Sequence, residues 1–128
     1  MKKALLAVSI VSTSLLAGCA GSPLGNMVRG ERTETLNDRM QSWVGASEEQ
    51  LISSWGPPKN SYTLSSGAKV ISWEYVWGVY VGDRFYCNQK FMIDPNGIVT
   101  KWGNSNCRKS VSNPKLISKD IPIPQPTM

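Results

Sequence analysis

The sequence contains no histidine, which excludes a histidine general base, a histidine-containing catalytic triad and a histidine-ligated metal. It also lacks the two phosphate-binding glycine loops, G-x-x-x-x-G-K and G-x-G-x-x-G. Its nine acidic residues are scattered along the chain, so no pair stands out as general acid and base. We therefore expect no catalytic activity, no metal and no cofactor.

Positive charge is present only in mild excess. Fourteen Lys and Arg residues against nine Asp and Glu residues give a formal net charge of +5, and +3 once Lys2 and Lys3 are set aside. Nucleic-acid binding needs a concentrated basic face, so we expect no nucleic-acid partner. Five Trp, four Tyr and two Phe within 41% hydrophobic residues suffice for a small core, and 128 residues predict a single domain.

The N-terminal residues have the pattern of an export and lipidation signal. Two lysines precede a largely apolar run over residues 4–17, which is too short to cross a hydrocarbon core of about 30 Å. The run ends in Leu16-Ala17-Gly18-Cys19, which resembles the bacterial lipobox, where small residues precede a cysteine that is acylated and becomes the mature N-terminus. We expect residues 1–18 to be a signal peptide, with cleavage between Gly18 and Cys19 and lipid on Cys19.

The lipid would anchor the protein to a membrane. By resemblance to enterobacterial sorting rules, Ala20 and Gly21, with no aspartate directly after the cysteine, favour the outer membrane over the inner one. Anchoring would be firm, since each buried methylene contributes about 0.8 kcal/mol. The alternative is an ordinary secretory signal cut near Ala17-Gly18, with Cys19 incidental. We expect a lipid-anchored protein that faces the periplasm.

The other two cysteines form an even pair. Cys87 and Cys107 flank a predicted β-hairpin whose turn, Asp94-Pro95-Asn96-Gly97, is a strong turn signal. Folding about Asn96 brings the two cysteines close together across the hairpin, and in an oxidising periplasm this predicts a structural disulfide. A redox-active pair or a two-thiolate metal site is the alternative. The spacing is not C-x-x-C, however, and no further ligand completes a site.

Two short helices are predicted after a Gly-, Ser- and Pro-rich tether over residues 19–32. In the second helix, Ser47 and Gln50 match the S-x-x-Q capping box, and Gly56-Pro57-Pro58 ends the helix. Neither helix is long enough to persist alone, so both must pack on other elements. The first helix has an N-cap at Thr35 and an apolar stripe formed by Leu36, Met40, Trp43 and Val44.

Alternating apolar residues predict four antiparallel strands, over residues 61–65, 69–81, 85–93 and 98–102. Gly78 indicates a bend or bulge in the long second strand. The predicted fold class is α+β, with two short N-terminal helices packed on a three- to four-stranded antiparallel β-meander within residues 33–107. The strand face expected under the helices carries Ile71, Trp73, Tyr75, Trp77, Val79 and Val81.

Residues 108–128 differ in composition from the rest of the chain. They hold four of the eight prolines, and four basic residues against one acidic residue. This composition predicts a Pro-rich basic tail that is disordered, with extended polyproline conformation over residues 121–126. The alternative is a docking strand for a partner.

Residues 43–58 read WVGASEEQLISSWGPP, and the predicted meander follows them. This combination resembles the SmpA/OmlA (BamE-like) lipoprotein domains, which open with a G-x-S/T-x-x-x-Leu/Val…Gly-x-Pro helix and continue into an antiparallel sheet. The resemblance covers residues 42–104. It implies an α+β fold, a lipid anchor and a scaffolding role at the outer membrane, beside the barrel-assembly machinery in the case of BamE.

The chain departs from that family pattern in four ways. They are the Cys87/Cys107 pair, the second proline, the extra tryptophans and the basic tail. A similar layout also occurs in secreted protein inhibitors, and a fold alone does not determine a function.

Together these features predict a non-catalytic, lipid-anchored envelope protein that is a scaffold or binding module at the periplasmic face of the outer membrane. Its partner would be an envelope protein or polymer. The alternative is an inhibitor or ligand-binding module that uses the aromatic face of the sheet. Two small helices are too short to cover so long a strand, so some aromatic surface should stay exposed. The candidate binding surface is Tyr80 and Tyr86, on the strand faces expected away from the core, with Trp77 and Trp102.

Overall fold

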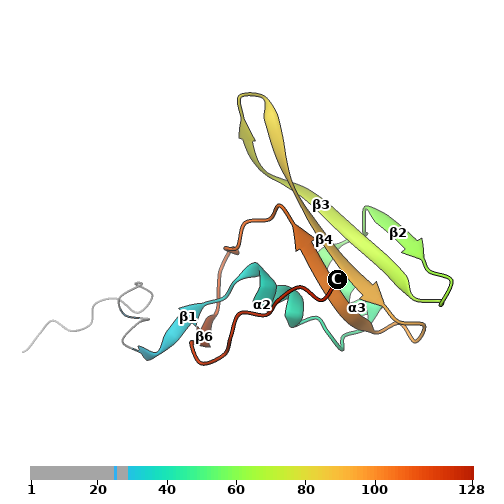
Figure 1. Cartoon of the computed structure of the whole chain (residues 1–128), viewed down its shortest axis with the longest axis horizontal. Coiled ribbons are helices and arrows are strands. Elements are labelled where there is room, and N and C mark those ends of the chain that lie inside the picture. The colour runs from blue at the N-terminus through green and yellow to red at the C-terminus, as the bar shows by residue number, and fades with distance from the viewer. Residues whose placement is uncertain (1–24, 26–28) are drawn as a thin grey trace, which may run out of the picture.

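The computed structural model describes residue 25 and residues 29–128 (Figure 1). The predicted cleavage site at Gly18 and the predicted lipid on Cys19 lie outside the described residues, as does most of the tether over residues 19–32. In the part of the chain that is described, no helix has the length and apolar character needed to cross a membrane.

The described chain forms a four-stranded sheet, a two-stranded sheet and two helices. The larger sheet is antiparallel with the order β2-β3-β4-β5, and β1 pairs with β6 in the smaller one. The predicted α+β class, with two short helices and an antiparallel meander, is confirmed, and the β1–β6 sheet is an addition to it. The elements are β1 (Glu31–Thr33), α2 (Leu36–Gln41), α3 (Glu48–Trp55), β2 (Asn60–Thr63), β3 (Lys69–Tyr80), β4 (Asp83–Ile93), β5 (Val99–Ser105) and β6 (Leu116–Ser118).

Both helices begin where their caps predict. Thr35 and Ser47 precede α2 and α3, and each forms a reciprocal capping box with the side chain three residues on. These boxes satisfy N–H groups that the first turn of a helix leaves unpaired. Helix α2 is shorter than its apolar stripe predicts because the chain turns after Gln41. The Gly45 N–H then donates to the Val99 carbonyl of β5 (2.8 Å).

The core lies between the two helices and one face of the four-stranded sheet. Trp102 Nε1 donates to Gln41 Oε1 of α2 (2.7 Å), and Trp73 Nε1 donates to the Gly56 carbonyl that follows α3 (3.1 Å). These bonds position the helices, while apolar burial supplies most of the stabilisation. The buried hydrophobic side chains are Leu36, Met40, Leu51, Ile71, Cys87, Phe91, Ile93, Val99 and Trp102.

The pairing of β3 with β4 shifts register at a β-bulge between Val76 and Gly78, which confirms the predicted irregularity at Gly78. Above the bulge, Gly78 pairs with Phe85. Paired residues share a face, so Tyr80, two residues after Gly78, lies on the face that carries Phe85 and Cys87. The prediction that Tyr80 faces away from the core side is therefore wrong. The bulge inserts one residue, which exchanges the two faces of the strand beyond it.

Residues 108–128 are ordered by pairing, so the prediction of a disordered tail is wrong. Strand β6 pairs with β1, which begins at Glu31, inside the predicted tether. The chain end then runs along the free edge of β5. There the Thr127 N–H donates to the Trp102 carbonyl (2.9 Å), and the Trp102 N–H donates to Thr127 Oγ1 (3.0 Å). Composition does not reveal this order because both partners, β1 and β5, are distant in the sequence.

The predicted disulfide between Cys87 and Cys107 is present, with a Cα–Cα distance of 4.5 Å. It joins β4 to the segment after β5, directly beyond the last β4–β5 pair, Asn88 with Ser105. Cross-linking residues 20 positions apart stabilises the fold by on the order of 3 kcal/mol, because it restricts the unfolded chain.

An ion pair joins β1 to α2. Arg32 donates two hydrogen bonds to the Asp38 carboxylate, both 2.7 Å, and the same carboxylate accepts from the Thr35 N–H (2.9 Å) and hydroxyl (2.6 Å). The hydrogen bonds from Arg32 hold the pKa of Asp38 well below its usual range, although burial acts in the opposite direction. The ionised form of Asp38 thus serves both the helix cap and the connection to the small sheet.

Acid should weaken this connection. The pKa of Asp38 is lower in the folded chain than in the unfolded chain, so its contribution to stability is full above about pH 4 and is lost as the pH falls. We expect the free energy of unfolding to decrease more for the wild type than for Asp38→Asn between neutral and strongly acidic pH. Urea denaturation at several pH values measures both slopes, and equal slopes would contradict the assignment.

Candidate functional site

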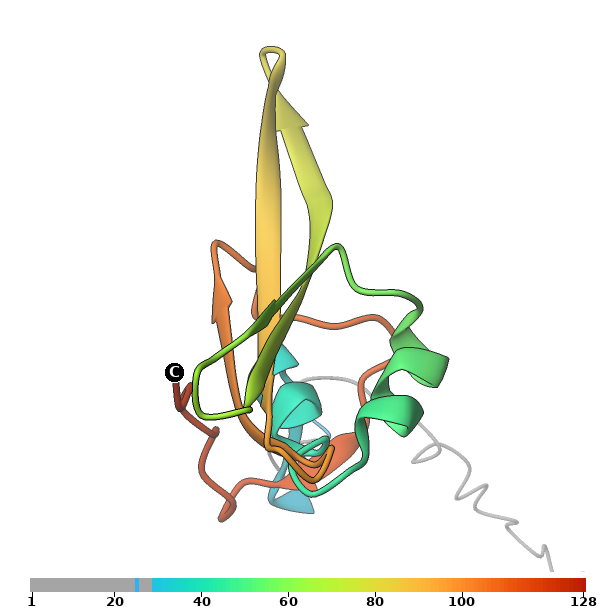
Figure 2. The ribbon, with the colours of Figure 1, turned by 90° about the vertical axis from the view of Figure 1, so that its right-hand side faces the viewer.

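The β3–β4 hairpin projects beyond the rest of the molecule, as Figure 1 and Figure 2 show. Strand β2 pairs with β3 only up to Ser72, and β5 pairs with β4 only from Asn88 onward. Residues 75–87, which we call the arm, therefore continue as a ribbon with no third strand within the described chain. A two-stranded ribbon alone is marginally stable, so the arm needs support at its base.

The arm carries large apolar side chains that remain exposed to solvent in the described structure. Where the helices cover the same two strands, Ile71 and Phe91 are buried. A cluster of exposed apolar side chains on a small domain marks an interaction surface. Seven of the twelve large hydrophobic side chains exposed among the described residues lie on the arm: Tyr75, Val76, Val79, Tyr80, Val81, Phe85 and Tyr86.

The tip of the arm is a two-residue turn, Val81-Gly82, with φ angles of 48° and 87°. Turns with positive φ at both positions favour Asn-Gly. Val81 is β-branched, and the left-handed conformation costs such a residue on the order of 1–2 kcal/mol. The tip thus holds an exposed apolar side chain in a strained conformation, which is typical of functional sites.

Ring contacts and the disulfide hold the base of the arm. The Trp77 and Phe85 ring centroids are 5.2 Å apart, and Arg108 Cζ lies 4.8 Å from the Trp77 centroid. The Trp77 indole N–H donates to the Asn106 carbonyl. With the Cys87–Cys107 bond, these contacts attach the segment after β5 to the ribbon and restrict its orientation.

Three of the four predicted binding residues lie on the arm. Tyr80 and Tyr86 are exposed, and Trp77 is partly buried at the base. Trp102 is fully buried under α2, so its prediction as a surface residue is wrong. Trp102 pairs with Phe91, which places its ring on the covered face of the sheet. Alternation shows which residues share a face, but it does not show which face is covered.

Val79, Val81 and Phe85 are also exposed on the arm and are absent from the predicted set. A signal for them exists in the sequence. The two alternating runs around Gly82 are much longer than the runs that flank them, so the outer part of that hairpin has no neighbouring strands to pack beside it.

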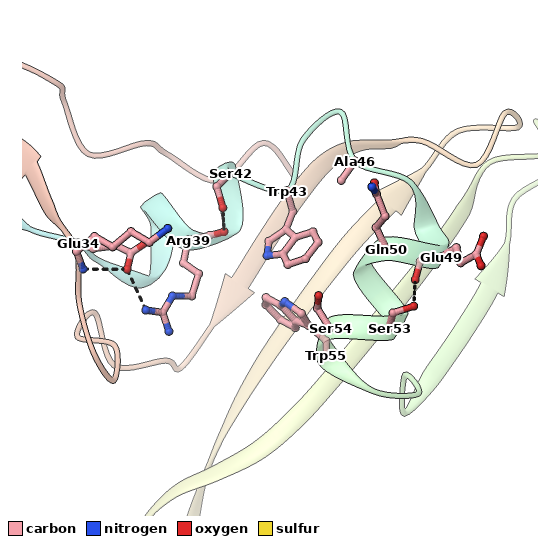
Figure 3. A pocket seen from close by; sticks show the side chains of 11 residues that line it. Glu34, Arg39, Ser42, Trp43, Ala46, Glu49, Gln50, Ser53, Ser54 and Trp55 are labelled. Carbon is pink, nitrogen blue, oxygen red and sulfur yellow. Dashed lines mark hydrogen bonds and ion pairs between the residues drawn. The ribbon is translucent and has the colours of Figure 1, made fainter.

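Apart from the arm, the described structure has a groove of about 880 Å³ between α2 and α3 (Figure 3). Trp43 and Trp55 line it and meet edge to face with ring centroids 6.4 Å apart. At one end, Glu34 forms an ion pair with Arg39 (2.9 Å). Burial raises the pKa of Glu34, but hydrogen bonds from Arg39 and from the Lys115 N–H outweigh burial, and the pKa is lower than usual.

Two polar side chains that line this groove bond to nearby backbone carbonyls. Arg39 also donates to the Ser112 carbonyl (3.0 Å), and the Ser53 hydroxyl donates to the Glu49 carbonyl (2.7 Å). No group of three or more His, Cys, Asp or Glu that could hold a metal ion occurs in the part of the chain described. The groove therefore offers aromatic and polar contacts.

The chain matches no protein-family model, no curated protein and no solved structure. The resemblance to SmpA/OmlA domains accordingly stays a prediction. The functional argument then depends on the geometry of the arm and its surroundings.

Relieving the strain at the tip should stabilise the domain. We expect Val81→Asn to raise the free energy of unfolding by about 1 kcal/mol, because asparagine tolerates positive φ and creates an Asn-Gly turn. Val79→Asn is the matched control, since it makes the same exchange nearby at a position without positive φ. Urea denaturation followed by tryptophan fluorescence compares the two. Equal or lower stability of Val81→Asn would show that the tip stores no strain.

Proposed function

We propose that this protein is a non-catalytic, lipid-anchored binding module at the periplasmic face of the outer membrane, and that its arm captures a partner protein. The observation that carries the proposal is the cluster of exposed apolar side chains on the arm. Tyrosine is enriched at interface hot spots, and the arm presents Tyr75, Tyr80 and Tyr86. Because the ribbon is already ordered, binding need not order a loop.

The position of the arm relative to the N-terminal side supports a protein partner. Strand β1 and the tip of the arm lie at opposite ends of the molecule in Figure 2. A lipid on Cys19 would keep the β1 end closer to the membrane than the tip, within the reach of the predicted tether. A tip at the end opposite the anchor favours a periplasmic protein over the lipid surface that carries the anchor.

An inhibitor is the second candidate. A narrow two-residue tip, Val81-Gly82, on a ribbon held by a disulfide also suits insertion into an enzyme cleft. Ligand binding on the aromatic face of the sheet has less support. Trp102 is buried there, and Trp73 packs against Trp55 with ring centroids 5.4 Å apart.

The arm can be tested with two tyrosines of equal exposure. We expect Tyr80→Ala to reduce capture of the partner by at least about tenfold, as loss of a hot-spot side chain does. Tyr62→Ala is the matched control, because Tyr62 is 68% exposed against 71% for Tyr80 but lies on β2. Crosslinking in intact cells followed by affinity purification measures capture, and thermal melting checks each fold.

Capture that falls equally in both tyrosine variants, at unchanged melting temperatures, would contradict the assignment of the arm. The captured protein also separates the two candidate functions. A barrel-assembly or secretion component identifies a scaffold, and a periplasmic hydrolase identifies an inhibitor.

The lipid anchor needs its own test. Cys19→Ser should abolish incorporation of an acyl label, because the thiol carries the first lipid, and unprocessed precursor or soluble protein should accumulate. Metabolic labelling, membrane fractionation and intact-mass measurement report these outcomes. A Cys19→Ser protein that stays membrane-bound with the mature mass would exclude the lipobox interpretation.

A further inference from the structure

Strand β4 has an open edge that runs along the arm. On one side β3 pairs with β4 along its length, but on the other side β5 begins to pair only at Asn88. The chain leaves the edge at Asn106, whose φ is 55°, and the Cys87–Cys107 bond holds it there. Beside Arg84 and Tyr86, no strand of the described chain completes the sheet.

The backbone of Arg84 and Tyr86 points toward this open side. The N–H and carbonyl of Trp102 bond Thr127 and therefore point away from β4. Phe91 is the β4 residue paired with Trp102, so the N–H and carbonyl of Phe91 point away from β5, toward β3. These groups alternate along a strand, so those of Asn88, Tyr86 and Arg84 point the other way. The position of the Asn88 carbonyl is consistent with this direction, since its oxygen lies 3.6 Å from Cys107 Sγ, on the side away from β3.

A hollow of about 730 Å³ lies beside the same edge, and its chemistry is basic and aromatic. Arg84 and Arg108 line it, and neither forms an ion pair with a described carboxylate. The carboxylate that lines it, Glu74, is engaged by Lys59. Its aromatic lining comes from Trp77, Phe85 and Tyr86.

We infer that this edge binds an extended acidic segment of a protein partner, added as a further strand beside Arg84 and Tyr86, with its carboxylates on Arg84 and Arg108. Strand addition uses exposed backbone groups for affinity and flanking side chains for specificity. The guanidinium groups of Arg84 and Arg108, which form no ion pair within the described chain, favour an acidic segment over a basic one. The inference rests on the proposed function, because it names the partner chemistry at the arm.

The structure contains an internal example of this mode of binding. The chain's own end lies along the free edge of β5 and exchanges hydrogen bonds with the backbone of Trp102. One edge of this sheet is therefore closed by an extended segment, and the β4 edge has the same kind of backbone groups available.

A labelled octapeptide of alternating valine and glutamate is the direct probe. Its fluorescence anisotropy should saturate below about 1 mM with the wild type, and the Arg84→Glu/Arg108→Glu variant should bind at least about tenfold more weakly. Lys101→Glu, a charge reversal on an exposed position of β5, should bind within about twofold of the wild type. Equal binding by the Arg84/Arg108 variant, or a lysine peptide that binds as well as the glutamate peptide, would overturn the inference.

Hydrogen exchange on the wild type removes any dependence on the folding of the variants. On peptide binding, the amides of Arg84 and Tyr86 should exchange at least about tenfold more slowly, while the Phe85 amide, which faces β3, should not change. A peptide N-methylated on alternate amides should lose this binding, because it cannot pair as a strand. Binding without protection of these two amides rejects strand addition.

Failure here can be separated from failure of the proposed function. If the natural partner is lost in Tyr80→Ala but retained in the Arg84/Arg108 variant, the arm binds through its tip and strand addition is wrong. If both variants retain the partner, the proposed function is wrong as well.

Discussion

The structure depends on the antiparallel pairing of β3 with β4, the ladder that joins Lys69–Tyr80 to Asp83–Ile93. Its lower half forms the centre of the four-stranded sheet, and both helices pack there. Its upper half has no further layer, and a bare ribbon is marginally stable. The fold therefore requires bracing where the cover ends, and the disulfide and the Trp77–Phe85 contact lie at that point.

The same strand pair consequently has two environments. Ile71 and Phe91 are buried under the helices, whereas Val79 and Tyr80 are exposed on the arm. Burial of Ile71 and Phe91 stabilises the domain because it removes their apolar surface from water. Val79 and Tyr80 stay exposed to water in the described structure, so under the proposed function their burial would contribute to binding. The division between stability and recognition follows from the place where β2, β5 and the helices stop.

Local signals predicted the parts of the fold that local physics determines. The Ser47 capping box, the turn at Asn96-Gly97, the alternation over residues 85–93 and the cysteine pair all depend on residues close in sequence or directly opposed in a hairpin. The β1–β6 pair joins two three-residue strands that are too short to show a period. The burial of Trp102 depends on which face α2 covers, and the face of Tyr80 depends on one extra residue in a bulge.

The free edges of β4 and β5 differ, because the C-terminal segment covers one and leaves the other open. The tail returns to close β5 at Trp102, although exposed edges invite unwanted pairing and are normally covered. At Arg84 and Tyr86 the edge stays open because the chain turns away from β4 at Asn106, beside the Cys87–Cys107 bond. A shortage of chain does not explain the difference, since more than twenty residues follow Asn106. The disulfide therefore supports the arm at the point where the chain leaves the neighbouring edge, and that edge has no strand of the described chain beside it.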